Sequence, residues 1–468
     1  MTQAAPRQTG NRTVFDAKGH SYTLLDKLGE GGQGVVCVTD RPGVLVKIAR
    51  HQKDDARQIW HSHLKWVMQQ ALEGLPIARP KVLIVKPRLG YVMELMDGLE
   101  PLSHVMQRAE ESLRPGGDST EWVRSGGLKR RLKVLARLAR VLAELHGRGL
   151  AYGDLSPANV FVSKGASHHE VWLIDCDNIS CLSRDAGQGI YSPDYGAPEV
   201  VRGEALADSR TDSWSFAVIA FRLLVLAHPL EGDLVVNGEP ELKDRAQRGE
   251  LPWVDDPADR CNALSTGLPR TMVATTRLRA LFEQAFGAGK IEPGSRPSLA
   301  EWAGAFADAA AVCITCQSEA CANSFFSNRE RQCTMCGSAV APQTYVALKE
   351  FFFVPLSELP DGSTPADSII DTGGRCAIDE EVAVLRTLPK SSSLFHEAQV
   401  CCFVELTAAG LQITPQTGTS IWVRRTGGKN PHRVSKPEVL NHKMRTGQTM
   451  LLHLDDPEKA HVFWRMVW

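Results

Sequence analysis

The stretch that decides the fold is YGDLSPANV at residues 152–160, and it is followed by LIDCD at residues 173–177. A phosphoryl-transfer site needs a carboxylate that orients the attacking hydroxyl and oxygen ligands for a Mg²⁺ ion that bridges the phosphates. Asp154 suits the first task, and Asn159 and Asp175 suit the second. Each residue alone could be an Asx turn or a loop carboxylate, but their order and spacing predict one phosphate-handling site.

A glycine cluster nearer the N-terminus offers a place for the phosphates. Gly29, Gly31, Gly34 and Val36 form a G-x-G-x-x-G-x-V pattern. In such a turn, backbone N–H groups approach phosphate oxygens because no side chain obstructs them. The pattern alone is weak, since any glycine-rich turn can produce it. Lys47 follows at the end of the apolar run VLVK, where a lysine can pair with the α- and β-phosphates or can be a solvated strand residue.

Hydrophobic periodicity predicts a strand-rich part followed by a helix-rich part. Residues 21–50 alternate short apolar runs with the glycine cluster, which predicts β-hairpins, and residues 81–97 return to strand-like runs. Leucines recur at three- and four-residue steps over residues 128–145, which predicts an amphipathic helix. Mostly helical patterns then continue to about residue 311.

Taken together, these motifs resemble those of the protein-kinase superfamily over about residues 20–305. The D-x-x-x-x-N loop matches at Asp154 and Asn159, and the D-F-G aspartate matches at Asp175. Further matches are A-P-E at residues 197–199, Asp212 at the start of a buried helix, Arg296 as the partner of the A-P-E glutamate, and Met93 to Met96 as gatekeeper and hinge.

The resemblance implies an α+β, bilobal protein-kinase fold that uses ATP with Mg²⁺ or Mn²⁺. It implies that Asp154 and Lys47 are catalytic and that Asn159 and Asp175 hold the metal. The nucleotide would contact the glycine loop and hinge residues, which are Gly29, Gly31, Gly34, Val36, Lys47, Glu94 and Met96. The expected activity is phosphorylation of Ser or Thr in a protein substrate.

Several positions depart from the family pattern. Gly153 stands where the family has the arginine of H-R-D, which makes control by activation-loop phosphorylation less expected. Ser156 replaces the usual catalytic-loop lysine, so lower turnover or a substitute cation is expected because electrostatic stabilisation dominates catalysis here. Residues 52–72, the expected regulatory helix, contain no glutamate to pair with Lys47. A nucleotide-binding pseudokinase scaffold is therefore the alternative hypothesis.

A cysteine-rich module follows the kinase-like region. Cys313 and Cys316 form one C-x-x-C pair, Cys333 and Cys336 form another, and sixteen residues separate the two pairs. Two such pairs can place four thiolates tetrahedrally around Zn²⁺, which predicts a structural zinc ribbon with no open catalytic position. A redox role is the alternative, and Cys321 is interpreted as a small core residue. A module this short depends on the metal for its folding.

A kinase domain followed by such a ribbon resembles a bacterial architecture found in phosphorylation systems associated with tellurite resistance and stress. That resemblance implies a von Willebrand A protein and a PP2C-type phosphatase as partners. It is an argument from architecture and not from chemistry.

The C-terminal region reads as short strands separated by Gly, Pro, Ser and Thr, which predicts an all-β sandwich. Gly374-Arg375, then residues 393–396 (SLFH), then residues 417–419 (TGT) are similar to the motifs of forkhead-associated domains. By that resemblance Arg375 and Ser393 would bind the phosphate of a phosphothreonine protein. An unrelated β-sandwich is the alternative, and Thr417 departs from the asparagine of the family motif.

These signals predict a flexible N-terminus at 1–19, a protein-kinase-like domain at 20–308, a zinc ribbon at 311–342 and an all-β domain at 343–468. A formal net charge of -1 gives no reason to expect nucleic-acid binding. The absence of a long apolar run predicts no membrane partner, and the polar start and scattered cysteines favour a cytoplasmic location. A small-molecule phosphotransferase of kinase-like fold is a further alternative, which A-P-E and Arg296 argue against.

Overall fold

The computed structural model describes residues 12–30, 34–50, 54–113, 118–181, 191–327, 331–387, 398–425 and 430–468. Its contacts divide the chain into two compact units. The first unit comprises residues 1–125, 133–269 and 276–303, and the second comprises residues 126–132, 270–275 and 304–468. Within the described residues, no helix is long and apolar enough to cross a membrane.

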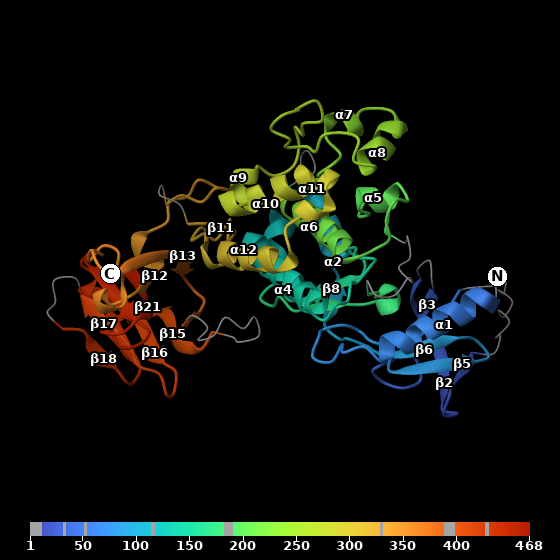
Figure 1. Cartoon of the computed structure of the whole chain (residues 1–468), viewed down its shortest axis with the longest axis horizontal. Helices are drawn as coiled ribbons and strands as arrows, with labels where there is room; N and C mark the ends of the chain where they lie inside the picture. The colour runs from blue at the N-terminus through green and yellow to red at the C-terminus, as the bar shows by residue number, and fades with distance from the viewer. Residues whose placement is uncertain are drawn as a thin grey trace, which may run out of the picture. The chain divides into compact units, whose positions relative to one another are not determined.

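The first unit begins with an antiparallel barrel, coloured blue in Figure 1, whose strand order is β1-β2-β3-β4-β6-β5. Its strands are β1 (Thr13–Asp16), β2 (Ser21–Glu30), β3 (Gly34–Thr39), β4 (Val44–Ala49), β5 (Val82–Lys86) and β6 (Gly90–Glu94). Apolar side chains, among them Val14, Val46 and Ile84, fill the barrel. The alternation of apolar residues that predicted hairpins therefore has a physical cause, because every second side chain of each strand points inward.

Helix α1 (Asp54–Met68) packs on the outside of this barrel through one apolar face. Trp60 and Leu64 lie in a buried cluster with Tyr91 and Met93 of β6. The rings of Trp60 and Tyr91 have centroids 6.1 Å apart. The helix thus presents an indole to the barrel in the stretch where the sequence lacks a glutamate.

The rest of the first unit is mostly helical, in agreement with the periodicity of the sequence. Its helices are α2 (Leu102–Ser112), α3 (Thr120–Arg124), α4 (Gly127–Gly147), α5 (Pro198–Val201), α6 (Ser209–Val225), α7 (Asp233–Val236), α8 (Pro240–Gln247), α9 (Arg270–Val273), α10 (Thr276–Phe286), α11 (Ala288–Ile291) and α12 (Leu299–Ala311); α9 and parts of α4 and α12 belong to the second unit. A three-stranded sheet of β7 (Leu99–Pro101), β8 (Val160–Ser163) and β9 (Val171–Leu173) carries the loops of the predicted site.

Helix α6 lies at the centre of this helical part. Asp208 is its N-cap and forms a capping box with Thr211. The Asp208 carboxylate accepts from the backbone N–H of Thr211, and the hydroxyl oxygen of Thr211 accepts from the backbone N–H of Asp208. Its rings of Trp214 and Phe221 pack edge-on against Phe286 at centroid distances of 5.4 and 6.0 Å. Edge-to-face pairs of this kind add to the stabilisation that comes from burial.

A buried ion pair joins the A-P-E segment to the end of this helical part. The guanidinium of Arg296 donates two hydrogen bonds to Glu199, at 2.8 and 2.7 Å, and a third to the carbonyl oxygen of Gly289 at 2.8 Å. It also lies over the ring of Trp214, 5.0 Å from the centroid. The pairing predicted from the kinase resemblance is therefore present in the structure.

The second unit contains the cysteine module and two antiparallel sheets. The module has β10 (Cys313–Thr315) and β11 (Ser324–Phe326). One sheet has the order β13-β12-β21-β20-β17-β18 and the other has the order β14-β15-β16-β19. Their strands are β12 (Val346–Phe353), β13 (Ile369–Ile378), β14 (Ala383–Arg386), β15 (Val400–Thr407), β16 (Gly410–Pro415), β17 (Ile421–Arg425), β18 (His432–Val434), β19 (Glu438–Asn441), β20 (Thr449–His453) and β21 (His461–Val467).

Side chains of both sheets share one apolar core, which includes Leu348, Val404, Ile413 and Leu452. Among the described residues of 346–467, the structure has strands and short 3-10 turns and no α-helix. This content agrees with the all-β region that the sequence predicts, and Figure 1 shows the strands in orange and red.

Asp379 links the cysteine module to the rest of the second unit. Its carboxylate accepts from the backbone N–H of Thr315 at 2.9 Å and from the ammonium of Lys129 at 3.0 Å. Burial raises the pKa of Asp379, but the charge of Lys129 and these hydrogen bonds outweigh it, so the pKa is lowered. Asp379, the residue after β13, thus holds the module to the rest of the unit. The two predicted C-terminal domains lie in one compact unit.

The buried pair of Arg296 and Glu199 gives a stability prediction. Arg296→Ala leaves the carboxylate of Glu199 buried without its cation, so we expect a loss of about 3–5 kcal/mol in the free energy of unfolding. Arg245→Ala is the control, because its pair with Glu250 is exposed and is worth about 1 kcal/mol or less. Denaturant unfolding of the full chain, followed by tryptophan fluorescence, measures both. Equal effects of the two variants would contradict the assignment.

Candidate active site

The structure supplies a partner for Lys47 that the sequence did not reveal. The ammonium of Lys47 donates a hydrogen bond to Asp177 Oδ2 at 2.8 Å and another to Asp175 Oδ1. Trp60 Nε1 of α1 donates to the same Asp177 oxygen at 3.1 Å. Asp177 lies in the 3-10 turn η1 (Cys176–Asn178) that follows β9. The carboxylate therefore occupies the role expected of a helix glutamate.

Burial and charge act in opposite directions on these groups. Burial alone would lower the pKa of Lys47, but the carboxylates of Asp177 and Asp175 outweigh it and raise the pKa. Burial and the charge of Asp177 raise the pKa of Asp175, and Lys47 opposes them only in part. Two carboxylates that share one cation are short of positive charge, which favours the binding of a further cation.

The backbone at Asp175 is itself unusual. Asp175 has φ +62 and ψ 66, in the left-handed region. A non-glycine residue in this conformation costs of order 1 kcal/mol and is found most often at functional sites. The conformation lets η1 begin directly after Asp175, so that Asp175 and Asp177 both reach Lys47.

The catalytic-loop aspartate is held by its neighbours. Ser192 Oγ donates to Asp154 Oδ1 at 2.8 Å. Asn159 Nδ2 donates to the backbone oxygen of Asp154 at 3.0 Å, which leaves the amide oxygen of Asn159 available to a metal ion. Burial raises the pKa of Asp154, and the hydrogen bond from Ser192 lowers it in part.

Asp212 of α6 fixes the start of this loop. Its carboxylate accepts from the backbone N–H of Tyr152 at 2.6 Å and from that of Gly153 at 2.9 Å. Gly153 has φ +89, and a Cβ there would lie 2.6 Å from the backbone oxygen of Asn178. The close approach explains why this chain has glycine at the position of the family's arginine.

Catalytic-loop residue Ser156 is buried, and its side chain carries no charge. Lys47 is a cation that acts on the Asp154 carboxylate, lowering its pKa against the effect of burial. Among the described residues, Lys47 thus contributes positive charge at Asp154, and a bound metal would add to it.

Residues of the glycine loop lie at the β2–β3 hairpin. Gly29 pairs with Val36 across the hairpin. A Cβ at Gly34 would lie 2.7 Å from the backbone oxygen of Ile48, so close strand packing requires glycine there. Gly31 lies outside the described residues.

The predicted hinge residues lie at the end of β6 and directly after it. Met93 is buried, whereas Glu94 is exposed and forms a salt bridge with Lys81 at 3.2 Å. Met96 is half-buried and lies between β6 and β7. The side chain of Glu94 is thus engaged at the surface.

In the cysteine module, the structure brings together Cys316, Cys321, Cys333 and Cys336, whose sulfur atoms all lie within 4.8 Å of one another. The Sγ atoms of Cys316 and Cys336 are 3.7 Å apart, and those of Cys321 and Cys333 are 3.8 Å apart. Four sulfurs around Zn²⁺ at about 2.3 Å would be separated by about 3.8 Å. The donor set therefore fits a tetrahedral zinc ion.

The predicted ligand set changes by one residue. Cys313 lies in β10, buried, with its thiol donating to the carbonyl oxygen of Ala309 at 3.5 Å. Cys321, which the sequence analysis interpreted as a core residue, takes its place in the cluster. The C-x-x-C spacing was misleading because Cys313 begins β10 and its thiol bonds back to α12, whereas Cys321 lies on the loop between β10 and β11.

The two residues predicted for a phosphopeptide site are only partly described. Arg375 lies in β13 and donates two hydrogen bonds to Asp371, at 2.9 and 2.8 Å. Those bonds lower the pKa of Asp371 to about 2. Ser393 lies outside the described residues. The charge of Arg375 is therefore already paired with an internal carboxylate.

Comparisons with known proteins identify the class of the first unit. Residues 22–249 match the family model of the protein kinase domain. The chain is 35% identical over 241 residues to serine/threonine-protein kinase pkn2 of Myxococcus xanthus, covering 49% of this chain and 27% of that protein. It is 29% identical over 205 residues to CBL-interacting protein kinase 4 of Oryza sativa subsp. japonica, covering 43% and 42%.

A third relative is myosin light chain kinase A of Dictyostelium discoideum, 24% identical over 246 residues, covering 50% of this chain and 75% of that protein. The chain thus contains a protein kinase domain of the kind found in serine/threonine-protein kinases. It spans less than half the length of the first two of these relatives.

The cysteine cluster makes a direct prediction. Cys321→Ser removes one of the four clustered thiols, so we expect the purified chain to lose its equivalent of zinc. Cys313→Ser is the matched control and should keep the metal, because its sulfur is outside the cluster. Elemental analysis of both variants measures zinc per chain. Loss of zinc in Cys313→Ser together with its retention in Cys321→Ser would contradict the assignment.

The environment of Asp154 predicts a pH dependence. Ser192→Ala removes a hydrogen bond that lowers the pKa of Asp154, so the pKa should rise further above its ordinary value. The ionised carboxylate is the form that accepts a hydroxyl proton, so the acid limb of kcat/KM for phosphotransfer should move to higher pH. Ser167→Ala, in an exposed loop, is the control. An acid limb that stays in place in Ser192→Ala would refute the proposed link.

Proposed function

We propose that the chain is an ATP-dependent protein kinase that phosphorylates Ser or Thr of a protein substrate. The observation that carries this proposal is the ion pair of Lys47 with Asp175 beside the catalytic-loop residue Asp154. Three separate segments contribute these residues: β4, the loop after β9, and the loop between α4 and β8. A phosphate-binding lysine, a metal-binding carboxylate and a hydroxyl-orienting carboxylate are the parts that phosphoryl transfer requires.

The residues present fit ATP and Mg²⁺ or Mn²⁺. Asp175 and the amide oxygen of Asn159 would hold the metal, and Lys47 with the backbone of the glycine loop would hold the phosphates. When bound, the nucleotide supplies the phosphoryl group and the metal neutralises its charge. Asp154 would accept a hydrogen bond from the substrate hydroxyl and orient it, a position that Ser192 now occupies as donor.

Asp177 would act as a positioning residue in this site. It holds Lys47 and, through the indole N–H of Trp60, connects α1 to the metal-binding loop. A displacement of α1 would therefore act on Lys47 through one shared carboxylate. This arrangement supports an atypical kinase that does not use a helix glutamate.

A nucleotide-binding pseudokinase scaffold is the second candidate. It is favoured by the same contacts, because two carboxylates already engage Lys47, and by the uncharged Ser156 in the catalytic loop. Against a small-molecule phosphotransferase stands the buried pair of Glu199 and Arg296, which in the resemblance belongs to the substrate-binding part of protein kinases.

The second unit would recruit a partner or substrate. The cysteine cluster, proposed as a zinc ribbon, and the β-sandwich, proposed as forkhead-associated-like, are the parts concerned. A von Willebrand A protein and a PP2C-type phosphatase are the proposed partners, by architecture. A phosphothreonine protein bound at Arg375 and Ser393 would have to displace the carboxylate of Asp371 from Arg375.

The test is transfer of radiolabelled phosphate from ATP by the full chain, with Mg²⁺ or Mn²⁺. Asp154→Ala and Asp175→Ala should each abolish transfer above background, since one orients the hydroxyl and the other holds the metal. Asp177→Asn should keep measurable transfer but lower it roughly 10- to 100-fold, the loss of one charge-assisted hydrogen bond of about 1.5–3 kcal/mol.

Asp256→Asn is the matched control, because Asp256 caps a distant loop through the backbone N–H groups of Ala258 and Asp259. It should transfer phosphate at the wild-type rate. Transfer that persists unchanged in Asp154→Ala and Asp175→Ala would sink the site. Nucleotide binding without any transfer, to the chain itself or to candidate partners, would favour the scaffold.

A further inference from the structure

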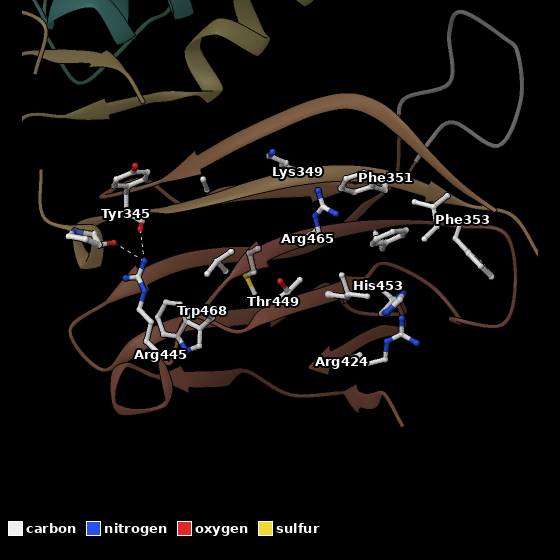
Figure 2. A pocket seen from close by; sticks show the side chains of 18 of the residues that line it. Tyr345, Lys349, Phe351, Phe353, Arg424, Arg445, Thr449, His453, Arg465 and Trp468 are labelled. Carbon is white, nitrogen blue, oxygen red and sulfur yellow. Dashed lines mark hydrogen bonds between the residues drawn. The ribbon is translucent and has the colours of Figure 1, made fainter. Parts of the chain in front are cut away.

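A large groove lies on the second unit, and none of the clustered cysteines lines it. It has a volume of about 1410 Å³ and is formed on the six-stranded sheet. Figure 2 shows Trp468 and Arg445 at one end and Phe353 and His453 at the other. In β12, β20 and β21, even-numbered residues such as Leu348 fill the sandwich core, and odd-numbered residues line the groove. The groove is therefore the outer face of the sheet.

A row of cations crosses this face. Lys349 of β12 pairs in register with Arg465 of β21, Arg465 pairs with Leu451 of β20, and Leu451 pairs with Arg424 of β17. At about 4.8 Å per strand, the row spans about 14 Å. The row also continues to Arg375 of β13, which pairs with Asp371.

Within the described residues these cations have no salt-bridge partner, although the charge of Lys349 acts on the nearby carboxylate of Asp371. Within the described part of the chain, Lys349, Arg465 and Arg424 form no salt bridge, and the residues that line the groove include no Asp or Glu. Like charges directly opposite each other on neighbouring strands destabilise a sheet. The pairing of Lys349 with Arg465 is therefore a cost to folding that a bound anion would relieve.

Three aromatic rings of the groove, those of Phe351, Phe463 and Trp468, already contact a neighbouring ring or guanidinium group. Phe351 stacks on Phe463 with centroids 5.4 Å apart, and the guanidinium of Arg465 lies 4.5 Å above the Phe351 ring. Arg445 lies 4.9 Å above the Trp468 ring. Single-stranded nucleic acid binds such faces by stacking bases on free rings, and here an arginine already lies over one face of Phe351 and one face of Trp468. The arrangement favours a polypeptide over a nucleic acid.

Polar atoms in the groove lack protein partners. Trp468 is 1% exposed and His453 is 4% exposed, yet Trp468 Nε1 and His453 Nε2 have no hydrogen-bond partner among the residues that the structure describes. His461 Nδ1 bonds the carbonyl oxygen of Lys459 at 2.7 Å, so its Nε2 is the acceptor for His453 Nδ1, also at 2.7 Å. In neutral His453 the free Nε2 is then an acceptor. A donor and an acceptor that both need partners match the C=O and N–H groups of a peptide backbone.

We propose that this groove binds an extended, acidic polypeptide segment of a partner protein. Alternate side chains of an extended segment are about 7 Å apart on one face, so two or three carboxylates fit the cation row. The backbone of the segment would satisfy Trp468 Nε1 and His453 Nε2 after a side-chain movement that uncovers these two buried atoms. This deepens the recruitment role proposed above, and it does not depend on kinase activity.

The test is selection from a random twelve-residue peptide library on the full-length immobilised chain, without ATP. The wild type should enrich peptides with Asp or Glu at alternate positions. Lys349→Gln and Arg424→Gln should each weaken binding of a selected peptide about tenfold or more, measured by fluorescence anisotropy. Lys436→Gln changes an exposed lysine of the same sandwich outside the groove, and should change the affinity by no more than about twofold.

A second readout separates binding from folding. Lys349 lies opposite the like charge of Arg465. Lys349→Gln should therefore unfold at the same or a higher denaturant concentration than the wild type. The same variant should bind the peptide more weakly. An equally long oligothymidylate and vesicles containing phosphatidylserine are the comparison probes. Both should bind more weakly than the selected peptide.

Three outcomes would overturn the proposal. They are a library selection without acidic enrichment, a selected peptide that binds Lys349→Gln and Arg424→Gln as well as the wild type, and tighter binding of the oligonucleotide or of the vesicles. Because no phosphotransfer is measured, an inactive kinase domain would leave each of these outcomes readable.

Discussion

The arrangement of the kinase domain depends on the ion pairs of the buried Lys47 ammonium. Lys47 is 3% exposed, and an unpaired buried charge of this kind would be strongly destabilising. Asp175 and Asp177 remove that cost, and in doing so they tie β4 of the barrel to the loop after β9. The left-handed backbone of Asp175 and the indole of Trp60 both support this pairing. The turn that carries Asp177 follows Asp175 directly, and the indole N–H donates a hydrogen bond to Asp177 beside the ammonium.

In the catalytic loop, too, one buried carboxylate holds the backbone in place. The carboxylate of Asp212 holds two successive backbone N–H groups at Tyr152 and Gly153, and the close approach of Asn178 leaves no room for a side chain at Gly153. The loop is therefore fixed by backbone hydrogen bonds where the family pattern has an arginine. The expectation that this loop needs no phosphate on the activation segment stays a prediction.

In the second unit, the cysteine module has a much smaller apolar core than the β-sandwich. The cysteine module contributes Ile314, Phe325 and Val340 to a small apolar cluster that also includes Ala377 of β13. This cluster is too small to order the module alone. The buried Asp379 contributes further contacts, and a zinc ion held by the four clustered thiols would contribute the rest. The sandwich core of the same unit is large and continuous. Its stability can offset the repulsion between the cations on the outer face of the sheet. In our proposal, a bound ligand supplies their counterions.

Much of the kinase domain was predictable, because its signals are local. The spacing of Asp154, Asn159 and Asp175, the leucine period of α4 and the A-P-E segment are properties of short stretches of chain, and the family comparison agrees with them. Partners distant in sequence were not predictable: Asp177 meets Trp60 of α1, Cys321 replaces Cys313, and the row from Lys349 to Arg424 requires the register of four strands. Periodicity and turn chemistry act between near neighbours, whereas ion pairs, metal ligands and sheet faces depend on which segments the folded chain brings within a few ångströms.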